Sequence, residues 1–326
     1  MLRIERHLTT DDLDKTLRRD VHDGLSAHPK SLPPKWFYDE RGSALFEEIT
    51  RLPEYYPTRT ERAILLRYAS GIGRATAADT LVELGSGSGE KTRLLLDALR
   101  TAGTLRRFVP VDVSGDFLEE AAGLVAAEYP GLDVRAEVAD FERHLHLLPA
   151  GGRRLVAILG STIGNQPPRR RVAFLSDLRS TLTEEDALLL GVDLVKDPGR
   201  LVAAYDDACG VTAEFNRNVL HVINRELDAD FAPEAFEHVA VWDERAEWIE
   251  MRLRAKAPQR VRVRALDLTA GFAEGEEMRT EISAKFRRPT VEAELGRAGF
   301  SLAHWWTDPA GDFALLVARP RVPGPG

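Results

Sequence analysis

LVELGSGSGEKT, residues 81–92, joins an apolar strand to a helix-forming stretch through the alternating glycines Gly85, Gly87 and Gly89. A turn this tight requires residues that tolerate positive φ and let a ligand approach the backbone, and glycine does both. A strand, a glycine loop and a helix in this order are typical of a nucleotide-binding loop in an α/β fold. The stretch therefore predicts an α/β protein with a ligand site at residues 85–89.

The spacing of the glycines separates two kinds of nucleotide site. A dinucleotide fold uses G-x-G-x-x-G and places a pyrophosphate at the helix N-terminus. Here Glu90 stands at the third glycine of that pattern, where its carboxylate would repel a pyrophosphate. The pattern E/D-x-G-x-G-x-G, which Glu83 completes, instead resembles motif I of the Rossmann-like S-adenosylmethionine (SAM) methyltransferases, whose cofactor has no phosphate. A glycine-rich turn without a ligand is the simplest alternative.

Two further predicted strands end in acidic residues. RFVPVDVS, residues 107–114, leads to Asp112, which can accept hydrogen bonds from both hydroxyls of a ribose, although a dehydrogenase would place an acid there too. LDVRAEVADF, residues 132–141, closes on Asp140 and Phe141, which suit a carboxylate for an amine beside an apolar wall for adenine. Each acid alone fits a solvated strand end. Acids at consecutive strand ends, where open α/β sheets bind ligands, favour a site.

Composition limits the classes of function. The chain has 326 residues, and its 44 Lys and Arg are interspersed with 52 Asp and Glu, so nucleic acid is not an expected partner. Its only cysteine, Cys209, excludes an intrachain disulfide and a cysteine-based metal site. His144 and His146 are interpreted as surface residues, and no metal is expected. The N-terminal MLRIERHLTTDD lacks the apolar run of a signal peptide, so we expect a cytoplasmic protein without a membrane partner.

Strands and helices alternate from about residue 80 onward, as expected for a parallel sheet that is buried on both faces. We predict strands at 80–85, 107–114, 132–141, 153–161 and 186–195, and helices at 61–70, 90–102, 115–128 and 169–182. After Lys196 the pattern changes to a helical region and two long amphipathic strands, 238–255 and 259–270, predicted to form one antiparallel hairpin. A helix at 289–298 and two antiparallel strands at 301–307 and 312–318 complete the sheet.

The N-terminal segment 29–61 contains WFYDERGSALFEEITRLPEYYPTRTE, which is too aromatic for a solvated arm. Together with LVELGSGSGEKT, LGSTIGN (159–165), LGVDLVKD and EEMRTEISAKF (276–286), it resembles the histidine-specific SAM-dependent methyltransferases over residues 15–319. The reaction of that family, the first committed step of ergothioneine biosynthesis, makes trimethylhistidine, or hercynine.

The resemblance implies a Rossmann-like class I SAM methyltransferase core, a mostly parallel sheet with an antiparallel last strand, at 60–196 and 286–320. It implies an inserted α+β substrate domain built from 1–59 and 197–285, and we expect a disordered tail at 321–326. The implied cofactor is SAM, the implied substrate is L-histidine, and a monomer is expected.

The resemblance also implies site residues by their position in the motifs. Those expected to contact SAM are Glu83, Gly85, Gly87, Lys91, Asp112, Asp140, Phe141 and Ser161. Those expected to contact histidine are Tyr38, Phe46, Tyr55, Asn165, Tyr205, Met251, Glu281, Ile282 and Ser283. Asn165 and Tyr38 are the candidate catalytic residues.

Methyl transfer to an amine is an in-line displacement that needs a neutral nucleophile held in place more than it needs a strong base. Asn165 can orient the amine through its amide oxygen, although it could instead be a turn residue before Pro167. Glu281 and Ser283 lie two residues apart, so in a strand both point to one side and could hold the two nitrogens of an imidazole. Without Ser283, Glu281 would be interpreted as a charged residue on the protein surface.

Three other functions compete with this interpretation. The nearest is a SAM-dependent methyltransferase for another free amino acid or an indole amine, such as a tryptophan derivative, which would lack the pair of Glu281 and Ser283. A second is an NAD-dependent reductase, against which Glu90 argues. The third is a binding module without catalysis, which would not need a complete set of pocket residues.

Overall fold

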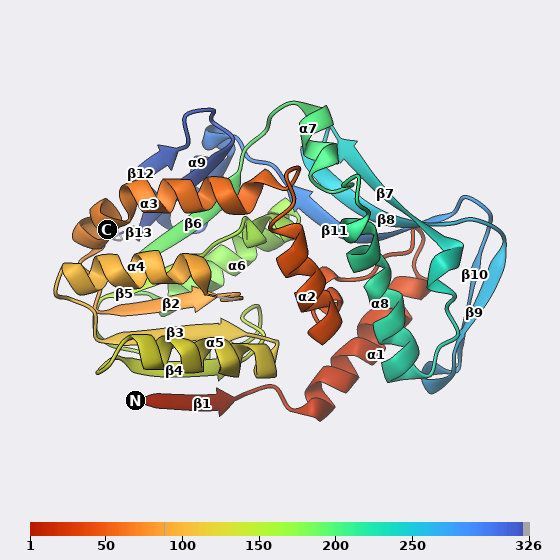
Figure 1. The fold of residues 1–326 in the computed structure, drawn as a ribbon, viewed down its shortest axis with the longest axis horizontal. Coiled ribbons are helices and arrows are strands. Elements are labelled where there is room, and N and C mark those ends of the chain that lie inside the picture. Colours follow the sequence, from red (N-terminus) through yellow and green to blue (C-terminus); the bar gives the residue numbers. More distant parts are fainter. Residues whose placement is uncertain (88, 322–326) are drawn as a thin grey trace. The chain divides into compact units, whose positions relative to one another are not determined.

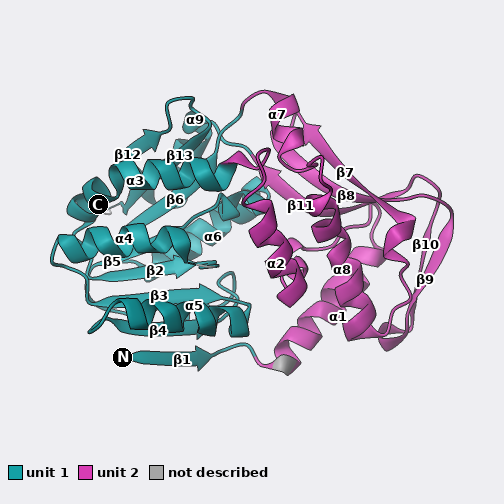
Figure 2. Cartoon of the chain, viewed as in Figure 1, with its two compact units in different colours: residues 1–8, 57–195, 285–326 teal, residues 9–56, 196–284 magenta. Residues whose placement is uncertain are grey.

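The computed structural model describes residues 1–87 and 89–321, so the predicted disordered tail lies outside the described residues beyond Arg321 (Figure 1). The chain divides into two compact units (Figure 2). Unit 1 comprises Met1–Leu8, Pro57–Val195 and Lys285–Gly326, and unit 2 comprises Thr9–Tyr56 and Lys196–Ala284. Each unit has its own hydrophobic core.

Unit 1 is built on an eight-stranded sheet in the order β1-β4-β3-β2-β5-β6-β13-β12. Neighbouring strands from β1 to β6 are parallel, and β13 is antiparallel to both β6 and β12. The mostly parallel sheet with a reversed last strand is therefore confirmed. The strands are β1 (Leu2–Arg6), β2 (Thr80–Leu84), β3 (Arg107–Asp112), β4 (Asp133–Val138), β5 (Arg154–Ile158), β6 (Ala187–Asp193), β12 (Phe300–Thr307) and β13 (Phe313–Pro320).

Helices cover both faces of this sheet. Figure 1 shows α3 (Tyr56–Thr76), α4 (Glu90–Thr101) and α5 (Gly115–Glu128) on one face, with α6 (Pro168–Thr181) and α9 (Arg288–Arg297) on the other. Every residue of β2, β5 and β6 is buried, which is why these strands read as continuous apolar runs. No helix within the described ranges has the length and apolar character that a membrane span requires.

The first strand of the sheet corrects a sequence-based boundary. The sequence assigns residues 1–59 to the substrate domain, but Met1–Leu8 belong to unit 1. β1 adds to the sheet beside β4, with Leu2 opposite Val134 and Arg6 opposite Val138. All five residues of β1 are exposed, so it has no buried face to produce a recognisable apolar pattern.

Unit 2 combines helices with two small antiparallel sheets. Its helices are α1 (Thr10–Ser26), α2 (Glu40–Ile49), α7 (Pro198–Ala203) and α8 (Val211–Leu227). A three-stranded sheet has the order β11-β8-β7, and β9 pairs with β10. These strands are β7 (Phe236–Asp243), β8 (Trp248–Ala255), β9 (Gln259–Val263), β10 (Leu268–Phe272) and β11 (Glu277–Ala284).

The predicted single hairpin of 238–255 and 259–270 is wrong, because each segment folds back on itself. β7 and β8 form one hairpin, with Glu247 at φ 53° in its turn, and β9 and β10 form another, with Asp267 at φ 48°. The alternation of polar and apolar residues continues through both turns, so the hydrophobic pattern does not show where the chain reverses its direction. β8 pairs with β7 and β11 instead of with β9.

Candidate active site

The glycine loop between β2 and α4 has the conformation that its sequence predicts. Gly85, Gly87 and Gly89 have φ angles of 76°, 52° and 69°, a region that favours glycine. Glu83, near the end of β2, is 2% exposed. Its carboxylate accepts hydrogen bonds from the hydroxyl of Ser86, at 3.0 Å, and from the hydroxyl of Thr92 on α4. The buried Glu83 carboxylate therefore links the glycine loop to α4 through hydrogen bonds.

Burial raises the pKa of Glu83 from 4.5 to about 7, against the opposing effect of the hydrogen bonds from Thr92 and Ser86. A carboxyl group whose folded pKa is raised contributes stability that is complete below its unfolded pKa and is lost as the pH rises through the folded value. Without ligand, this group alone should therefore lower the free energy of unfolding between pH 4.5 and about 7. The loss amounts to at most about 3 kcal/mol.

Glu83→Gln removes this titration while keeping an oxygen that can accept both hydroxyls. We expect the variant to gain stability relative to the parent as the pH rises, by up to about 3 kcal/mol near neutral pH. Urea unfolding of both proteins without ligand, from about pH 5 to about pH 8, measures the difference in their free energies of unfolding. The contributions of the other titrating groups are common to both proteins and cancel in this difference. Parallel pH curves would show that Glu83 is ionised throughout this range.

The ends of β3 and β4 bring further predicted residues to the same edge of the sheet. Asp112 accepts backbone hydrogen bonds from Gly87 at 3.4 Å and from Ser114 at 3.0 Å, and burial raises its pKa. Phe141 follows β4, and its ring lies 3.8 Å from where a Cβ on Gly85 would stand. The structure thus places an acid and an apolar ring beside the glycine loop; their contact with a cofactor stays a prediction.

Other candidates in unit 1 already have protein partners. The carboxylate of Asp140 accepts the backbone N–H of Glu142 at 3.0 Å, and Lys91 forms an ion pair with Glu61. Ser161, at φ 60°, accepts the backbone N–H of Asp193 with its hydroxyl oxygen at 3.0 Å. This bond anchors the loop after β5 to β6, and a contact of Ser161 with a cofactor remains a prediction.

Asn165 closes the short 3-10 helix η3 (Thr162–Asn165), which follows β5. The residue is partly exposed. Within the described part of the chain, no hydrogen bond engages its side-chain amide. This amide is therefore available to a ligand, which is what orientation of an amine requires.

In unit 2 a continuous row of side chains joins most of the predicted histidine contacts. Tyr38 packs on Phe46 with ring centroids 5.6 Å apart, Phe46 on Tyr55 at 6.1 Å, and Tyr55 on Tyr205 at 6.1 Å. The Tyr205 hydroxyl then hydrogen-bonds the Ser283 hydroxyl at 2.7 Å. Segments 38–55, 205 and 283 of the sequence thus form one surface of aromatic faces and hydroxyl groups.

Phe215 of α8 belongs to this row, although the sequence does not predict it. Its ring centroid lies 5.5 Å from that of Tyr38 and 5.9 Å from that of Phe46. The residue is 3% exposed and lies on the buried side of its helix. Helical periodicity alone would assign such a residue to the core, so the sequence carries no signal that separates it from an ordinary core phenylalanine.

The segment before α2 sets the position of Tyr38. Asn218 of α8 donates its amide N–H to the carbonyl of Phe37 at 3.2 Å and to the carboxylate of Asp39 at 2.7 Å. Asp39 in turn caps α2 by accepting the backbone N–H of Gly42 at 2.9 Å. A Cβ on Gly42 would lie 1.7 Å from the carbonyl oxygen of Phe37, so only glycine allows this approach.

Glu281 and Ser283, the two residues predicted to bind the imidazole, both lie on β11. Glu281 pairs with Met251 of β8, and Ser283 pairs with Ile249. A bulge interrupts the register between Arg279 and Glu281, but regular pairing resumes at Glu281. Glu281 and Ser283 therefore share a face of the strand, and alternation places Ile282 on the opposite face.

A buried polar network that the sequence does not predict lies behind Tyr205. The Nε2–H of His238 donates to the Tyr205 carbonyl at 2.8 Å, and its Nδ1 accepts from the amide of Asn216 at 2.8 Å. The amide oxygen of Asn216 accepts the hydroxyl of Thr280, on β11, at 2.6 Å. Burial lowers the pKa of His238, which agrees with the neutral ring that this bonding requires. The network connects Tyr205 to the strand that carries Glu281.

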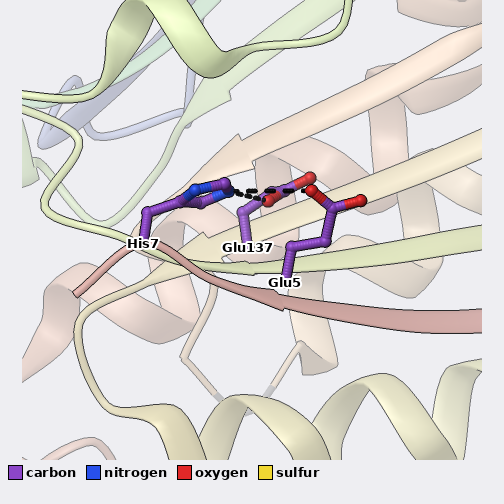
Figure 3. Close-up of side chains that lie close together, drawn as sticks. All are labelled: Glu5, His7 and Glu137. Carbon is purple, nitrogen blue, oxygen red and sulfur yellow. Dashed lines mark hydrogen bonds and ion pairs between the residues drawn. The ribbon is translucent and has the colours of Figure 1, made fainter. Parts of the chain in front are cut away.

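Within the part of the chain that the structure describes, Glu5, His7 and Glu137 form a group of potential metal ligands. Figure 3 shows the ring of His7 directed at Glu137, with Glu5 beside them. Nε2 of His7 lies 2.6 Å from a carboxylate oxygen of Glu137 and 3.9 Å from one of Glu5. The shorter distance is that of a direct hydrogen bond, so we interpret the pair as a link between β1 and β4. His144, predicted on the surface, is instead partly buried, while His146 is exposed.

Comparisons with known proteins place these observations in context. The family model described as histidine-specific methyltransferase, SAM-dependent, matches residues 17–320. A histidine N-alpha-methyltransferase of Mycolicibacterium smegmatis is 61% identical over 97% of this chain and 99% of that protein. One from Mycobacterium tuberculosis is 58% identical over 97% and 98%. Ergothioneine biosynthesis protein 1 of Neurospora crassa is 34% identical over 60% of this chain and 23% of its own length.

Proposed function

Because the chain belongs to the histidine-specific SAM-dependent methyltransferase family, we propose that it methylates the α-amino nitrogen of L-histidine. Three successive transfers from SAM would yield N,N,N-trimethylhistidine, or hercynine, as in the first step of ergothioneine biosynthesis. The observation that carries the proposal is the row from Tyr38 to Ser283 in unit 2, which offers hydroxyl groups and aromatic faces without net charge. Aromatic faces suit an amine that ends as a fixed cation.

We assign cofactor binding to unit 1. The residues present fit SAM: Asp112 suits the ribose hydroxyls, Phe141 beside Gly85 suits adenine, and Lys91 suits the carboxylate of the amino-acid end. SAM, when bound, supplies the electrophilic methyl group on its sulfonium. The glycine loop keeps its backbone open to a ligand. Apart from chain neighbours, no heavy atom of the described residues would lie within 4 Å of a Cβ on Gly87, and a Cβ on Gly85 would meet Phe141 and Thr162.

The protein's part in the chemistry is to hold a neutral amine in line with the methyl group. The α-amino group titrates at about pH 8, so a neutral fraction exists near neutral pH and no strong base is needed. Asn165 would accept an amine N–H with its amide oxygen and keep the lone pair directed at the methyl carbon. With SAM bound, the nitrogen would take the methyl group while the sulfonium leaves as a neutral thioether, and the proton released from the nitrogen would pass to solvent before the next transfer. Tyr38 and Tyr205 supply hydroxyl groups without net charge, which suits an amine that becomes more substituted with each transfer.

Recognition of the imidazole is assigned to Glu281 and Ser283 on the same face of β11. A carboxylate accepts an imidazole N–H, and a hydroxyl can donate to or accept from the other nitrogen. Met251, across the ladder from Glu281, is 2% exposed and supplies apolar surface for the ring. An indole offers only one N–H, so it would leave part of this pair unsatisfied.

Asp112→Ala is expected to weaken SAM binding by about 10- to 150-fold, the equivalent of roughly 1.5–3 kcal/mol for hydrogen bonds to a charged group. The KM for histidine at saturating SAM should not change, because Asp112 serves only the cofactor. Calorimetric titration with SAM measures the effect. Asp116→Ala is the matched control, since that carboxylate is fully exposed on α5. Unchanged SAM affinity would remove Asp112 from the cofactor site.

Mass spectrometry of the purified protein with SAM and L-histidine tests the proposed function directly. We expect mono-, di- and trimethylated histidine, and little or no product from a panel of other amino acids that includes tryptophan. Preferred methylation of tryptophan or another amino acid would overturn the substrate assignment. Absence of SAM binding together with NADH binding in a fluorescence titration would favour a reductase and overturn the proposal as a whole.

A further inference from the structure

Glu61 is a fully buried carboxylate to which no role has been assigned above. It lies near the start of α3 and is 0% exposed. Both of its oxygens accept the backbone N–H of Gly160 at 2.9 Å. One of them also forms an ion pair with the ammonium of Lys91. A single carboxylate thus contacts the first turn of α4 and the loop after β5.

The surrounding backbone is shaped around this carboxylate. A Cβ on Gly191, in β6, would lie 1.9 Å from an oxygen of Glu61, so a side chain at that position would displace the carboxylate. Gly160 has φ 70°, the left-handed region, and its N–H points at the carboxylate. Burying an ionised carboxylate is expensive unless it is paired and hydrogen-bonded. The arrangement therefore gives a buried carboxylate a backbone donor and a cationic partner at a position where a core residue would otherwise be apolar.

The ion pair of Glu61 and Lys91 differs from the other buried pairs of unit 1. In the pairs Arg154–Asp186, Arg171–Glu294 and Lys285–Asp193 both side chains are between 0% and 5% exposed. Lys91 keeps 20% of its side chain accessible beside the glycine loop. A lysine ammonium has three N–H donors, so it can bind Glu61 and a ligand carboxylate together. Those pairs are closed to solvent, whereas the Glu61–Lys91 pair retains a cation that a ligand can reach.

The loop held by Glu61 is also the loop that carries Asn165. Gly160 lies shortly after the end of β5, and η3 ends at Asn165. The Lys91 ammonium lies 3.6 Å from where a Cβ on Gly160 would stand, so the two groups bound by Glu61 are neighbours. Displacing the carboxylate would therefore move both the cation assigned to SAM and the start of the loop assigned to the amine.

We propose that Glu61 is a positioning residue that fixes the Lys91 ammonium and the Gly160 peptide relative to each other. The inference rests on the proposed function, because Lys91 is assigned to the carboxylate of SAM. In this arrangement Lys91 is presented to the cofactor in one orientation, and the loop that carries Asn165 starts from a fixed point. Glu61 does not itself contact either substrate.

Glu61→Gln tests the inference with an almost isosteric change. The amide oxygen can still accept the Gly160 N–H, but the charge is lost and an NH₂ group faces Lys91. We expect the Kd for SAM to rise by roughly 10- to 100-fold, the effect of losing a charge-assisted partner, and kcat to fall. The KM for histidine at saturating SAM should change much less. Glu61→Asp, which keeps the charge on a shorter side chain, should recover part of the SAM affinity.

A double-mutant cycle separates positioning from simple destabilisation. If Glu61 acts through Lys91, the double variant Glu61→Gln/Lys91→Met should bind SAM no more weakly than Lys91→Met alone. Asp186→Asn is the matched control, since it neutralises another fully buried carboxylate at the opposite, amino-terminal ends of β5 and β6. It should lower the free energy of unfolding but leave the Kd for SAM within about twofold of the parent value.

Three outcomes would overturn the inference. The first is a SAM affinity of Glu61→Gln equal to that of the parent. The second is a double variant that binds SAM more weakly than Lys91→Met by the full factor seen in Glu61→Gln. The third is a loss of SAM affinity in Asp186→Asn as large as that in Glu61→Gln. Each leaves the proposed function intact if the parent binds SAM and methylates histidine. A parent that does not bind SAM would instead overturn the proposed function, and this inference with it. If Glu61→Gln does not fold, the same cycle is run with Glu61→Asp.

Discussion

Replacing Glu281 with alanine is expected to raise the KM for histidine by about 10- to 150-fold while SAM binding stays intact. The reason is the loss of a charge-assisted hydrogen bond from the imidazole N–H, which contributes roughly 1.5–3 kcal/mol in a partly buried site, at about 1.4 kcal/mol per tenfold change. Glu281 is partly exposed and pairs with the buried Met251 across the ladder. A ligand would therefore find a carboxylate beside apolar surface.

The same variant should also be less selective. The lost contact serves only the imidazole, and the vacated carboxylate no longer opposes an indole, so the ratio of kcat/KM for histidine over tryptophan should fall. A competition assay with both amino acids measures this ratio. Glu274→Ala, which removes an exposed carboxylate shortly before β11, is the control and should leave the ratio unchanged. If Glu281→Ala prefers histidine over tryptophan as strongly as the parent does, another residue recognises the imidazole, and Tyr55 is the next candidate.

Asn165→Ala is expected to lower kcat on histidine by about 100-fold and to leave the Kd for SAM nearly unchanged. A nucleophile that is displaced by about an ångström loses turnover on this scale, since most of the rate comes from alignment. The amide makes no hydrogen bond within the described residues, so alanine removes no internal support for the loop. Single-turnover kinetics at saturating histidine, combined with calorimetry of SAM binding, separates the two quantities.

A near-normal kcat for Asn165→Ala would mean that the residue only forms the turn before Pro167. In that case free energies of unfolding would report its role, and the amine would have to be oriented by the tyrosine hydroxyls alone. Tyr205→Phe then provides the next test, because the Tyr205 hydroxyl is hydrogen-bonded to Ser283 at 2.7 Å.

Local patterns were sufficient wherever a feature is produced by neighbours in sequence. The glycine loop is one case, because positive φ at Gly85, Gly87 and Gly89 follows from residue type. The parallel strands are another, since strands buried on both faces leave continuous apolar runs. The acids after these strands meet at one sheet edge because parallel strands end there, which is why Asp112 could be placed near Gly87.

Local patterns failed where pairing is decided by distant partners. β1 is exposed along its whole length and is recognisable only by the register that it forms with β4, more than 120 residues away. The alternation of 238–255 is compatible with one strand or with two, and the choice depends on β11 occupying the edge of β8 that β9 was predicted to take. Periodicity reports which residues face the core but not which strand lies alongside.

For the site, the sequence by itself determined the kinds of group available: the glycines, the strand-end acids, Asn165, and the tyrosines and carboxylate that the family resemblance singled out. Only the tertiary structure decided which of them touch. Glu61 carries a faint signal, an acid on the same helical face as the buried Ile64 and Leu65. Its role became visible only through contacts with Lys91 and Gly160, which are 30 and 99 residues away. The physical reason is that a buried charge is tolerated only where distant segments supply its partners, and a sequence does not state which segments meet.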